Sequence, residues 1–138
     1  MNQWLFGLHP LRVQGNIYTI SITGYGPADV GPYMELKRFV NVNSGLECHH
    51  IVEVEHLRLF NTLYMDFNAP SIAIPASMHR RLISPRFTAE MNVFGGRRGG
   101  IADGIAKEEL LDLYRQVYTW HTPFQELYTI SKNILNQA

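Results

Sequence analysis

Two adjacent histidines, His49 and His50, are the residues whose types and spacing most directly suggest chemistry. Adjacent side chains on a strand point to opposite faces, so one imidazole can bind a metal ion while the other accepts a proton. Hydrolysis of a phosphodiester requires a base that activates water and a cation that neutralises charge on the phosphate and the leaving oxygen. A histidine pair alone is more often incidental, so the elements around it decide its meaning.

The residues around the pair predict a strand. Residues 46–52 (LECHHIV) alternate so that Glu47 and His49 share one face and His50 lies on the other. Glu47 is therefore a candidate to orient His49 through a hydrogen bond to its ring. Cys48 is the only cysteine and is expected to be a small buried residue. A single cysteine excludes an internal disulfide and a thiolate zinc cluster.

The next part of the chain predicts a second strand and a helix. A long connection over residues 53–68 precedes them, and a loop of this length in a compact domain is often functional. Residues 71–74 (SIAI) predict the strand, and residues 76–83 (ASMHRRLI) predict a helix whose first turn tolerates Pro75. This order of elements can bring His79, on the helix, close to the histidine pair.

The remaining elements are predicted from periodicity and turn residues. They are a hairpin over 11–22 that turns at Gly15 and Asn16, a turn-rich connector over 24–32, helical turns over 33–39 and 54–60, a helix over 107–118, and a last helix that begins near Pro123. The apolar stripes of the two long helices are Leu110, Tyr114, Val117 and Tyr118 in the first, and Leu127, Ile130 and Ile134 in the last.

Length and composition limit the class of protein. The chain has 138 residues, of which 46% are hydrophobic and 17% charged, as expected for one globular domain over residues 1–138. It lacks the run of about 18 apolar residues that a membrane helix needs, and its start does not resemble a signal peptide, so we expect no membrane contact. Because the formal net charge is zero, nucleic acid must be bound by a local patch.

Such a patch is predicted directly after His79. Between His79 and Gly100 a single acidic residue, Glu90, stands against five arginines: Arg80, Arg81, Arg86, Arg97 and Arg98. The planar fork of arginine matches the oxygens of phosphate. The GGRRGG sequence at 95–100 is either a phosphate-binding loop or a solvated loop without a ligand. No helix-turn-helix and no aromatic ladder is visible, so reading of base sequence is not predicted.

These motifs resemble a known family. Residues 47–53 (ECHHIVE) resemble the signature strand of the His-Asn-His, or ββα-metal, endonucleases, especially the toxin branch with a double histidine. Residues 68–75 (NAPSIAIP) followed by His79 resemble the second strand and helix of that family. The segments that also resemble such domains of bacterial polymorphic toxins are 30–33, 36–37 and 83–90. The resemblance covers a little under half of the chain.

The resemblance implies a role for each matching residue. His49 and His79 are implied to bind the metal ion, His50 to be the general base, and Asn68 to be the asparagine of the motif. The implied cofactor is a divalent cation, Mg²⁺ first, with Zn²⁺, Mn²⁺ and Ni²⁺ as the other candidates. The residues expected to orient these groups or to contact phosphate are Glu47, Arg80, Arg97 and Arg98.

The chain departs from the family pattern at two places. Ile83 stands where colicin-type relatives carry a further histidine, which favours a cation held by few side chains, water and phosphate over a three-histidine zinc site. The family commonly has a second asparagine where this chain has Ser71 and Ile72, and Asn61 is a weaker stand-in for the motif asparagine.

The other histidines have weaker claims. His56 lies in the long connection and is either an additional ligand or a solvated loop residue. His9 and His121 have no partner in the sequence and are interpreted as structural. Glu90 has a weaker claim than Glu47 to an orienting role.

We therefore expect an α+β domain with a ββα-metal core at about 46–84, an N-terminal hairpin, and C-terminal helices at about 106–119 and 123–136. The predicted activity is metal-dependent cleavage of DNA. The resemblance implies an antibacterial effector domain that is delivered as part of a secreted protein, acts in the cytoplasm of the target cell, and is neutralised by a cognate immunity protein. The alternatives are an RNA-cleaving nuclease of the same fold and a non-enzymatic binding module in which the histidines hold a structural zinc.

Overall fold

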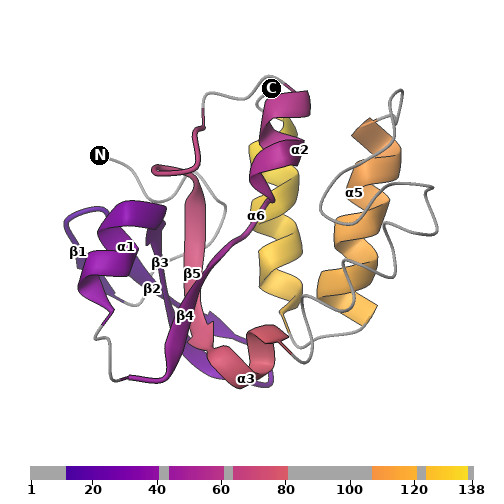
Figure 1. Cartoon of the computed structure of the whole chain (residues 1–138). Helices are drawn as coiled ribbons and strands as arrows, with labels where there is room; N and C mark the ends of the chain where they lie inside the picture. The colour runs from indigo at the N-terminus through magenta and orange to yellow at the C-terminus, as the bar shows by residue number, and fades with distance from the viewer. Residues whose placement is uncertain (1–11, 41–43, 61–63, 81–106, 121–123, 137–138) are drawn as a thin grey trace.

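The computed structural model of the chain describes residues 12–40, 44–60, 64–80, 107–120 and 124–136. Five antiparallel strands form one sheet in the order β1-β2-β3-β5-β4 (Figure 1). The strands are β1 (Arg12–Gln14), β2 (Ile17–Ile22), β3 (Gly26–Pro32), β4 (Leu46–His50) and β5 (Pro70–Pro75). Because β5 enters the sheet between β3 and β4, the strand that carries the histidine pair is the last in this order.

Helices cover both faces of the sheet, as Figure 1 shows. On one face α1 (Tyr33–Phe39) packs against β3, β4 and β5. On the other face lie α5 (Lys107–Arg115), a π-helical turn η3 (Gln116–Trp120) and α6 (Gln125–Asn136). The two short helices α2 (Val54–Leu59) and α3 (Ala76–Met78) come before and after β5. Of the helices in the described ranges, none is long and apolar enough to cross a membrane.

The two faces of the sheet bury two separate cores. The larger core joins the sheet to α5, η3 and α6 and contains every residue of the two predicted helical stripes: Leu110, Tyr114, Val117, Tyr118, Leu127, Ile130 and Ile134. The smaller core lies under α1 and contains Ile17, Leu36 and Ala73. Each fully buried aliphatic side chain contributes about 1.5–3 kcal/mol through the hydrophobic effect, so the larger core supplies most of the stability.

The register of β4 against β5 assigns the two histidines to these faces. His49 lies opposite Ile72, and Cys48 lies opposite Ala73. Residues directly opposite each other in an antiparallel pair point to the same side of the sheet. Because Ile72 belongs to the larger core and Ala73 to the smaller one, His49 faces the C-terminal helices. His50, one residue further, faces the side of α1.

Most elements predicted from the sequence are confirmed. The hairpin forms with Gly15 at its turn in a left-handed conformation (φ 61°), which glycine adopts without steric cost. The two strands and the helix that surround the histidines also form, although the helix over 76–83 is described only as far as Arg80. The helix over 107–118 forms as α5 continued by η3, and the last helix begins at Gln125.

The prediction of a connector over 24–32 was wrong for residues 26–32, which form the central strand β3, whereas Gly24 and Tyr25 lie in a turn. Its glycines and prolines conceal an alternation in which Ala28 and Val30 are buried. Val30 lies opposite Tyr18 of β2 on one side and Ile72 of β5 on the other. Pairing with two neighbours therefore overrides the weak strand propensity of the segment.

Candidate functional site

His49 is held in the larger core. Its side chain is only 6% exposed, and its Nε2 lies 2.7 Å from the hydroxyl oxygen of Tyr118. Burial lowers the pKa of His49 well below its usual value, and the neighbouring His79 and His50 lower that pKa further. His49 is therefore a neutral imidazole at physiological pH, which is the form that binds metal ions.

The structure brings His79 next to His49. The ring centroids of the two imidazoles are 4.9 Å apart, and the rings are tilted by 51°. Two imidazoles that bind one ion at about 2.1 Å place their centroids about 5 Å apart. The two rings come from β4 and from the residue that ends α3, and the turn between β5 and α3 is what brings them together. The separation and the donor type fit a divalent transition metal or a cation of similar size.

Glu47 fixes the orientation of His79. Its Oε1 lies 2.9 Å from Nδ1 of His79, and its Oε2 accepts a hydrogen bond of 2.6 Å from Arg80. The hydrogen bonds from His79 and then from Arg80 hold the pKa of Glu47 below its usual value. Because a carboxylate only accepts hydrogen bonds, Nδ1 of His79 carries a proton and Nε2 of its neutral form carries the lone pair. This carboxylate–histidine arrangement is typical of metal ligands.

Strand alternation made Glu47 a candidate to orient His49, and the structure shows its carboxylate bonded to His79. The register explains the difference, because Leu46 lies opposite Pro75. The turn from β5 into α3 consequently passes beside Glu47 and delivers His79 to its carboxylate. Residues two apart on one strand share a face, but they do not approach as closely as a residue returning from a neighbouring strand.

His50 lies on the opposite face of β4 and has different partners. Its ring stacks on the ring of Tyr33, with centroids 4.3 Å apart and an angle of 15°. Its Nε2 lies 2.9 Å from the backbone oxygen of Asp66. Because a carbonyl only accepts, Nε2 of His50 donates this bond, and Nδ1 of the neutral ring carries a lone pair. His50 is half-buried, so this nitrogen belongs to a ring that solvent reaches.

Asn68 acts on the loop that holds His50. Its Oδ1 accepts a hydrogen bond of 2.7 Å from the backbone N–H of Met65, and the backbone N–H of Ala69 donates to the oxygen of Met65 at 2.9 Å. These bonds close the turn that presents the carbonyl of Asp66. Asn68 therefore stiffens the turn whose backbone oxygen, on Asp66, contacts His50.

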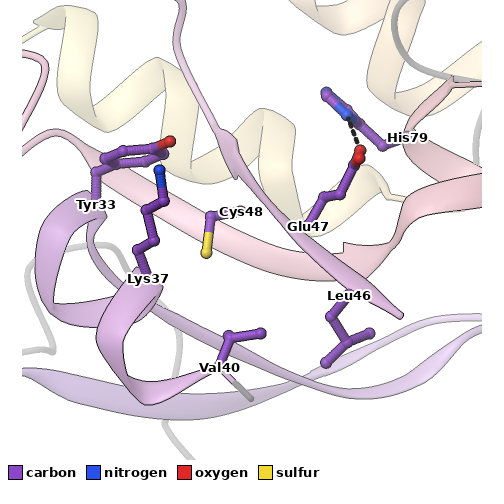
Figure 2. A pocket seen from close by; sticks show the side chains of 7 residues that line it. All are labelled: Tyr33, Lys37, Val40, Leu46, Glu47, Cys48 and His79. Carbon is purple, nitrogen blue, oxygen red and sulfur yellow. Dashed lines mark hydrogen bonds and ion pairs between the residues drawn. The ribbon is translucent and has the colours of Figure 1, made fainter. Parts of the chain in front are cut away.

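A cavity of about 440 Å³ lies between α1 and β4 (Figure 2). It is lined by Tyr33, Lys37, Val40, Leu46, Glu47, Cys48 and His79. Figure 2 shows Glu47 turned toward His79, while Cys48 lies on the side of Lys37 and Tyr33. The ammonium of Lys37 is 5.5 Å from the centroid of the Tyr33 ring, a cation–π distance. Cys48 is half-buried, and burial raises the pKa of its thiol, which agrees with a packing role.

His56 is wholly buried, so the solvated interpretation of this residue was wrong. Its Nδ1 lies 2.6 Å from the hydroxyl of Tyr114, and that hydroxyl accepts a hydrogen bond of 2.8 Å from the backbone N–H of Glu53. Burial lowers the pKa of His56 to about 4 and raises the pKa of Glu53 to about 7. His56, Tyr114 and Glu53 therefore form a buried polar cluster that is separate from the contacts of His49 and His50.

For the pair His49 and His50, sequence reasoning missed the partners Tyr33, Asp66 and Tyr118. The one available signal was Tyr118, since a tyrosine on a buried helical stripe needs a partner for its hydroxyl. Asp66 contributes only its backbone, which no sequence pattern reveals. Arg97, Arg98, Ile83 and Glu90 lie outside the described residues, as do Asn61, His9 and His121.

The described residues contain no group of three or more histidine, cysteine, aspartate or glutamate side chains arranged to hold a metal ion. Comparison of the chain with protein-family models, with curated proteins and with solved structures found no significant match.

Proposed function

We propose that this protein is a metal-dependent endonuclease that hydrolyses phosphodiester bonds of DNA, built on a ββα-metal core of β4, β5 and α3. The observation that carries the proposal is the convergence of His49 and His79, with ring centroids 4.9 Å apart, beside a third histidine held on the other face of the same strand. The resemblance of residues 47–53 and 68–79 to double-histidine nucleases supports the same assignment.

His49 and His79 hold the cation in this proposal, and Glu47 keeps the ring of His79 in position. A bound divalent cation supplies charge neutralisation at the phosphate and at the leaving oxygen. Arg80 lies beside this centre, with its side chain 72% exposed and one nitrogen on Glu47, so it can extend the positive field toward a phosphate.

His50 is the proposed general base. The hydrogen bond from its Nε2 to the backbone oxygen of Asp66 leaves the lone pair on Nδ1, which would accept the proton of the attacking water, and the stacked ring of Tyr33 restricts rotation. Lys37 lines the adjacent cavity, between α1 and β4, and adds a second positively charged side chain to that of Arg80. We infer that the substrate backbone crosses this end of β4, between Lys37 and Arg80.

The test is a cleavage assay with the parent protein and two variants. Plasmid DNA and total RNA are incubated with Mg²⁺, Mn²⁺, Zn²⁺ or Ni²⁺, and with a chelator. We expect the parent to cut DNA only with a cation, since the chelator removes the group that neutralises the phosphate. His50→Ala should lose 10²–10⁴-fold in rate, the range of general-base catalysis, and still bind the metal. His79→Ala should lose metal affinity.

Each alternative predicts a different result. Cleavage of RNA alone would assign the fold to a ribonuclease. Unfolding by the chelator, together with full function of His50→Ala, would identify a structural zinc module. Cleavage of DNA by His50→Ala at the parent rate would refute the proposed base.

The resemblance to toxin nucleases supports a further part of the proposal, namely that the domain is an antibacterial effector with a cognate immunity protein. Expression in a bacterial cytoplasm should then stop growth for the parent and permit growth for His50→Ala at equal protein levels. Co-expression of a neighbouring gene product that binds the domain should restore growth. Normal growth with soluble, active parent protein would contradict an effector role.

A further inference from the structure

The cavity between α1 and β4 has opposite charges at its two ends (Figure 2). At one end lies the ammonium of Lys37, 5.5 Å from the centroid of the Tyr33 ring. At the other end lies the carboxylate of Glu47, turned toward His79. Within the described ranges, Lys37 forms no ion pair with a carboxylate. The positive charge of Lys37 can therefore bind an anionic group that enters the cavity.

Apolar side chains line the cavity between these ends. Val40, at the end of α1, and Leu46, at the start of β4, both line it and pack against the smaller core. The volume of about 440 Å³ lies within the range of about 300–1,000 Å³ that is usual for small-molecule sites. The cavity is thus large enough for a ligand with an anionic group and a flat, largely apolar body.

The carboxylate of Glu47 can accept a further hydrogen bond. Its Oε1 contacts His79, and its Oε2 accepts from Arg80. A carboxylate has about four lone-pair positions, so two contacts do not saturate it. A ligand in the cavity is therefore favoured if it also carries an N–H or O–H group at the end opposite its anionic group.

We propose that this cavity binds one unpaired nucleotide of the DNA substrate, with its phosphate at Lys37 and an N–H of its base toward Glu47. The sugar and the base then lie against Val40 and Leu46. The cavity alone implies an anion joined to an apolar body with a donor, whereas the identification of this ligand as a nucleotide rests on the proposed nuclease function.

The place of the cavity beside the proposed centre supports this assignment. His79, a proposed metal ligand, lines the cavity, and so does Tyr33, whose ring stacks on His50. A strand with one nucleotide in the cavity therefore passes close to the proposed metal ligand and to the support of the proposed base.

The same contacts predict the form of DNA that binds. Each of the four bases carries at least one N–H on its pairing edge, so a contact with Glu47 does not select a base sequence. In a duplex these N–H groups are paired and the bases are stacked. A nucleotide must leave the stack to enter the cavity, which has a cost that single-stranded DNA does not incur.

Cys48 provides a direct test, because it is the only cysteine of the chain and lines the cavity. The parent protein is kept metal-free with a chelator and is labelled with iodoacetamide at increasing concentrations of thymidine 5′-monophosphate, and mass spectrometry follows the reaction. We expect the nucleotide to slow the labelling of Cys48 in a saturable manner. Thymidine and inorganic phosphate should each protect only at higher concentrations, since each makes part of the contacts.

Arg38 provides a matched control for Lys37. Both are exposed cations in the last turn of α1, and only Lys37 lines the cavity. The concentration of thymidine 5′-monophosphate that gives half-maximal protection should rise roughly 10-fold for Lys37→Gln, because a charge-assisted contact with phosphate is lost. For Arg38→Gln it should change less than about threefold, because a more distant exposed charge is screened. Protection by thymidine, which lacks the phosphate, should be the same in both variants.

A second comparison tests the source of the nucleotide. A single strand of oligothymidine should protect Cys48 at a lower concentration than the duplex that it forms with oligoadenine. Equal protection by the duplex would overturn the requirement for an unpaired nucleotide. Protection by thymidine 5′-monophosphate without protection by the single strand would overturn the DNA strand as the source and indicate a free nucleotide.

The remaining outcomes separate this inference from the proposed function. Unchanged labelling of Cys48 at millimolar thymidine 5′-monophosphate overturns the nucleotide site even if the protein cuts DNA. Equal weakening by Lys37→Gln and Arg38→Gln overturns the contact of Lys37 with phosphate. Protection as expected, in a protein that cuts no DNA with any of the four cations, supports the nucleotide site and refutes its role in cleavage.

Discussion

The buried His56 should make the fold sensitive to acid, and His56→Asn should remove that sensitivity. His56 is 0% exposed, and its Nε2 has no hydrogen-bond partner among the described residues. Within the described ranges, the carboxylate oxygen closest to it is on Glu53, 4.0 Å away. An asparagine amide can still offer a group to the hydroxyl of Tyr114, but it does not titrate.

The sign and size of the effect follow from the pKa of His56. Burial lowers this pKa to about 4 in the folded protein, whereas an unfolded histidine has a pKa of about 6.5. Below about pH 6.5 the unfolded chain takes up a proton that the folded chain refuses, so the free energy of unfolding falls as the pH falls. The difference between the two pKa values corresponds to a loss of about 3 kcal/mol by pH 4.

Glu53 acts in the opposite direction. Its pKa is raised to about 7 by burial, so its folded form holds a proton that the unfolded chain has lost between about pH 4.5 and 7. Stability from this group increases as the pH falls. Glu53 and His49 are present in both the parent and His56→Asn, so comparing the two proteins at each pH removes the part of their contributions that does not depend on His56.

The assay is urea unfolding of both metal-free proteins at several pH values from 7.5 to 4, followed by circular dichroism. The free energy of unfolding of the parent should fall relative to that of His56→Asn by about 3 kcal/mol over this range. Parallel curves for the two proteins would refute the buried, neutral state of His56. A difference in the free energy of unfolding that stays constant with pH reflects only the change in packing caused by the substitution.

Three further substitutions test the site and the core. Glu47→Gln leaves His79 a weaker, uncharged acceptor, so Ni²⁺ affinity should fall 10–100-fold in calorimetry, and an unchanged affinity would contradict the orienting role of the carboxylate. Tyr33→Ala should slow DNA cleavage without changing metal affinity. Tyr33→Phe keeps the stacked ring and should cut DNA near the parent rate. Equal cleavage rates for the two variants would exclude stacking as the support of His50. Leu127→Ala should lower the free energy of unfolding by about 2–5 kcal/mol in urea, because the side chain is fully buried, and a loss below 1 kcal/mol would place it outside a tightly packed core.

Local sequence patterns were sufficient for most of the fold. The alternation in β4 and the period of α5 and α6 predict elements that form, since these segments have a clear apolar face. β3 was missed because its two buried side chains, Ala28 and Val30, are small or isolated between glycine and proline. Only its neighbours in the sheet make it a strand, and those neighbours come from distant parts of the chain.

For the candidate site, the sequence predicted which residue types occur and which face of the strand each occupies, but it did not predict which residue each side chain contacts. The opposite faces of His49 and His50 follow from strand geometry, and their separate surroundings in the structure agree with it. The pairing of Glu47 with His79 depends on where β5 ends relative to β4, and the contact of Tyr118 depends on how η3 packs on the sheet. Both are properties of tertiary register, which a single sequence does not encode in any local pattern.

The register of β4 against β5, in which His49 lies opposite Ile72, determines which of the two adjacent histidines faces the larger core. A shift of β4 by one residue would move every side chain of the strand to the opposite face. His49 would then leave the larger core, and His50 would enter it. Deletion of one residue before the pair, Glu47 or Cys48, would therefore exchange the environments of His49 and His50 while both histidines remain in the sequence. Length in this short stretch matters as much as the identity of the histidines themselves.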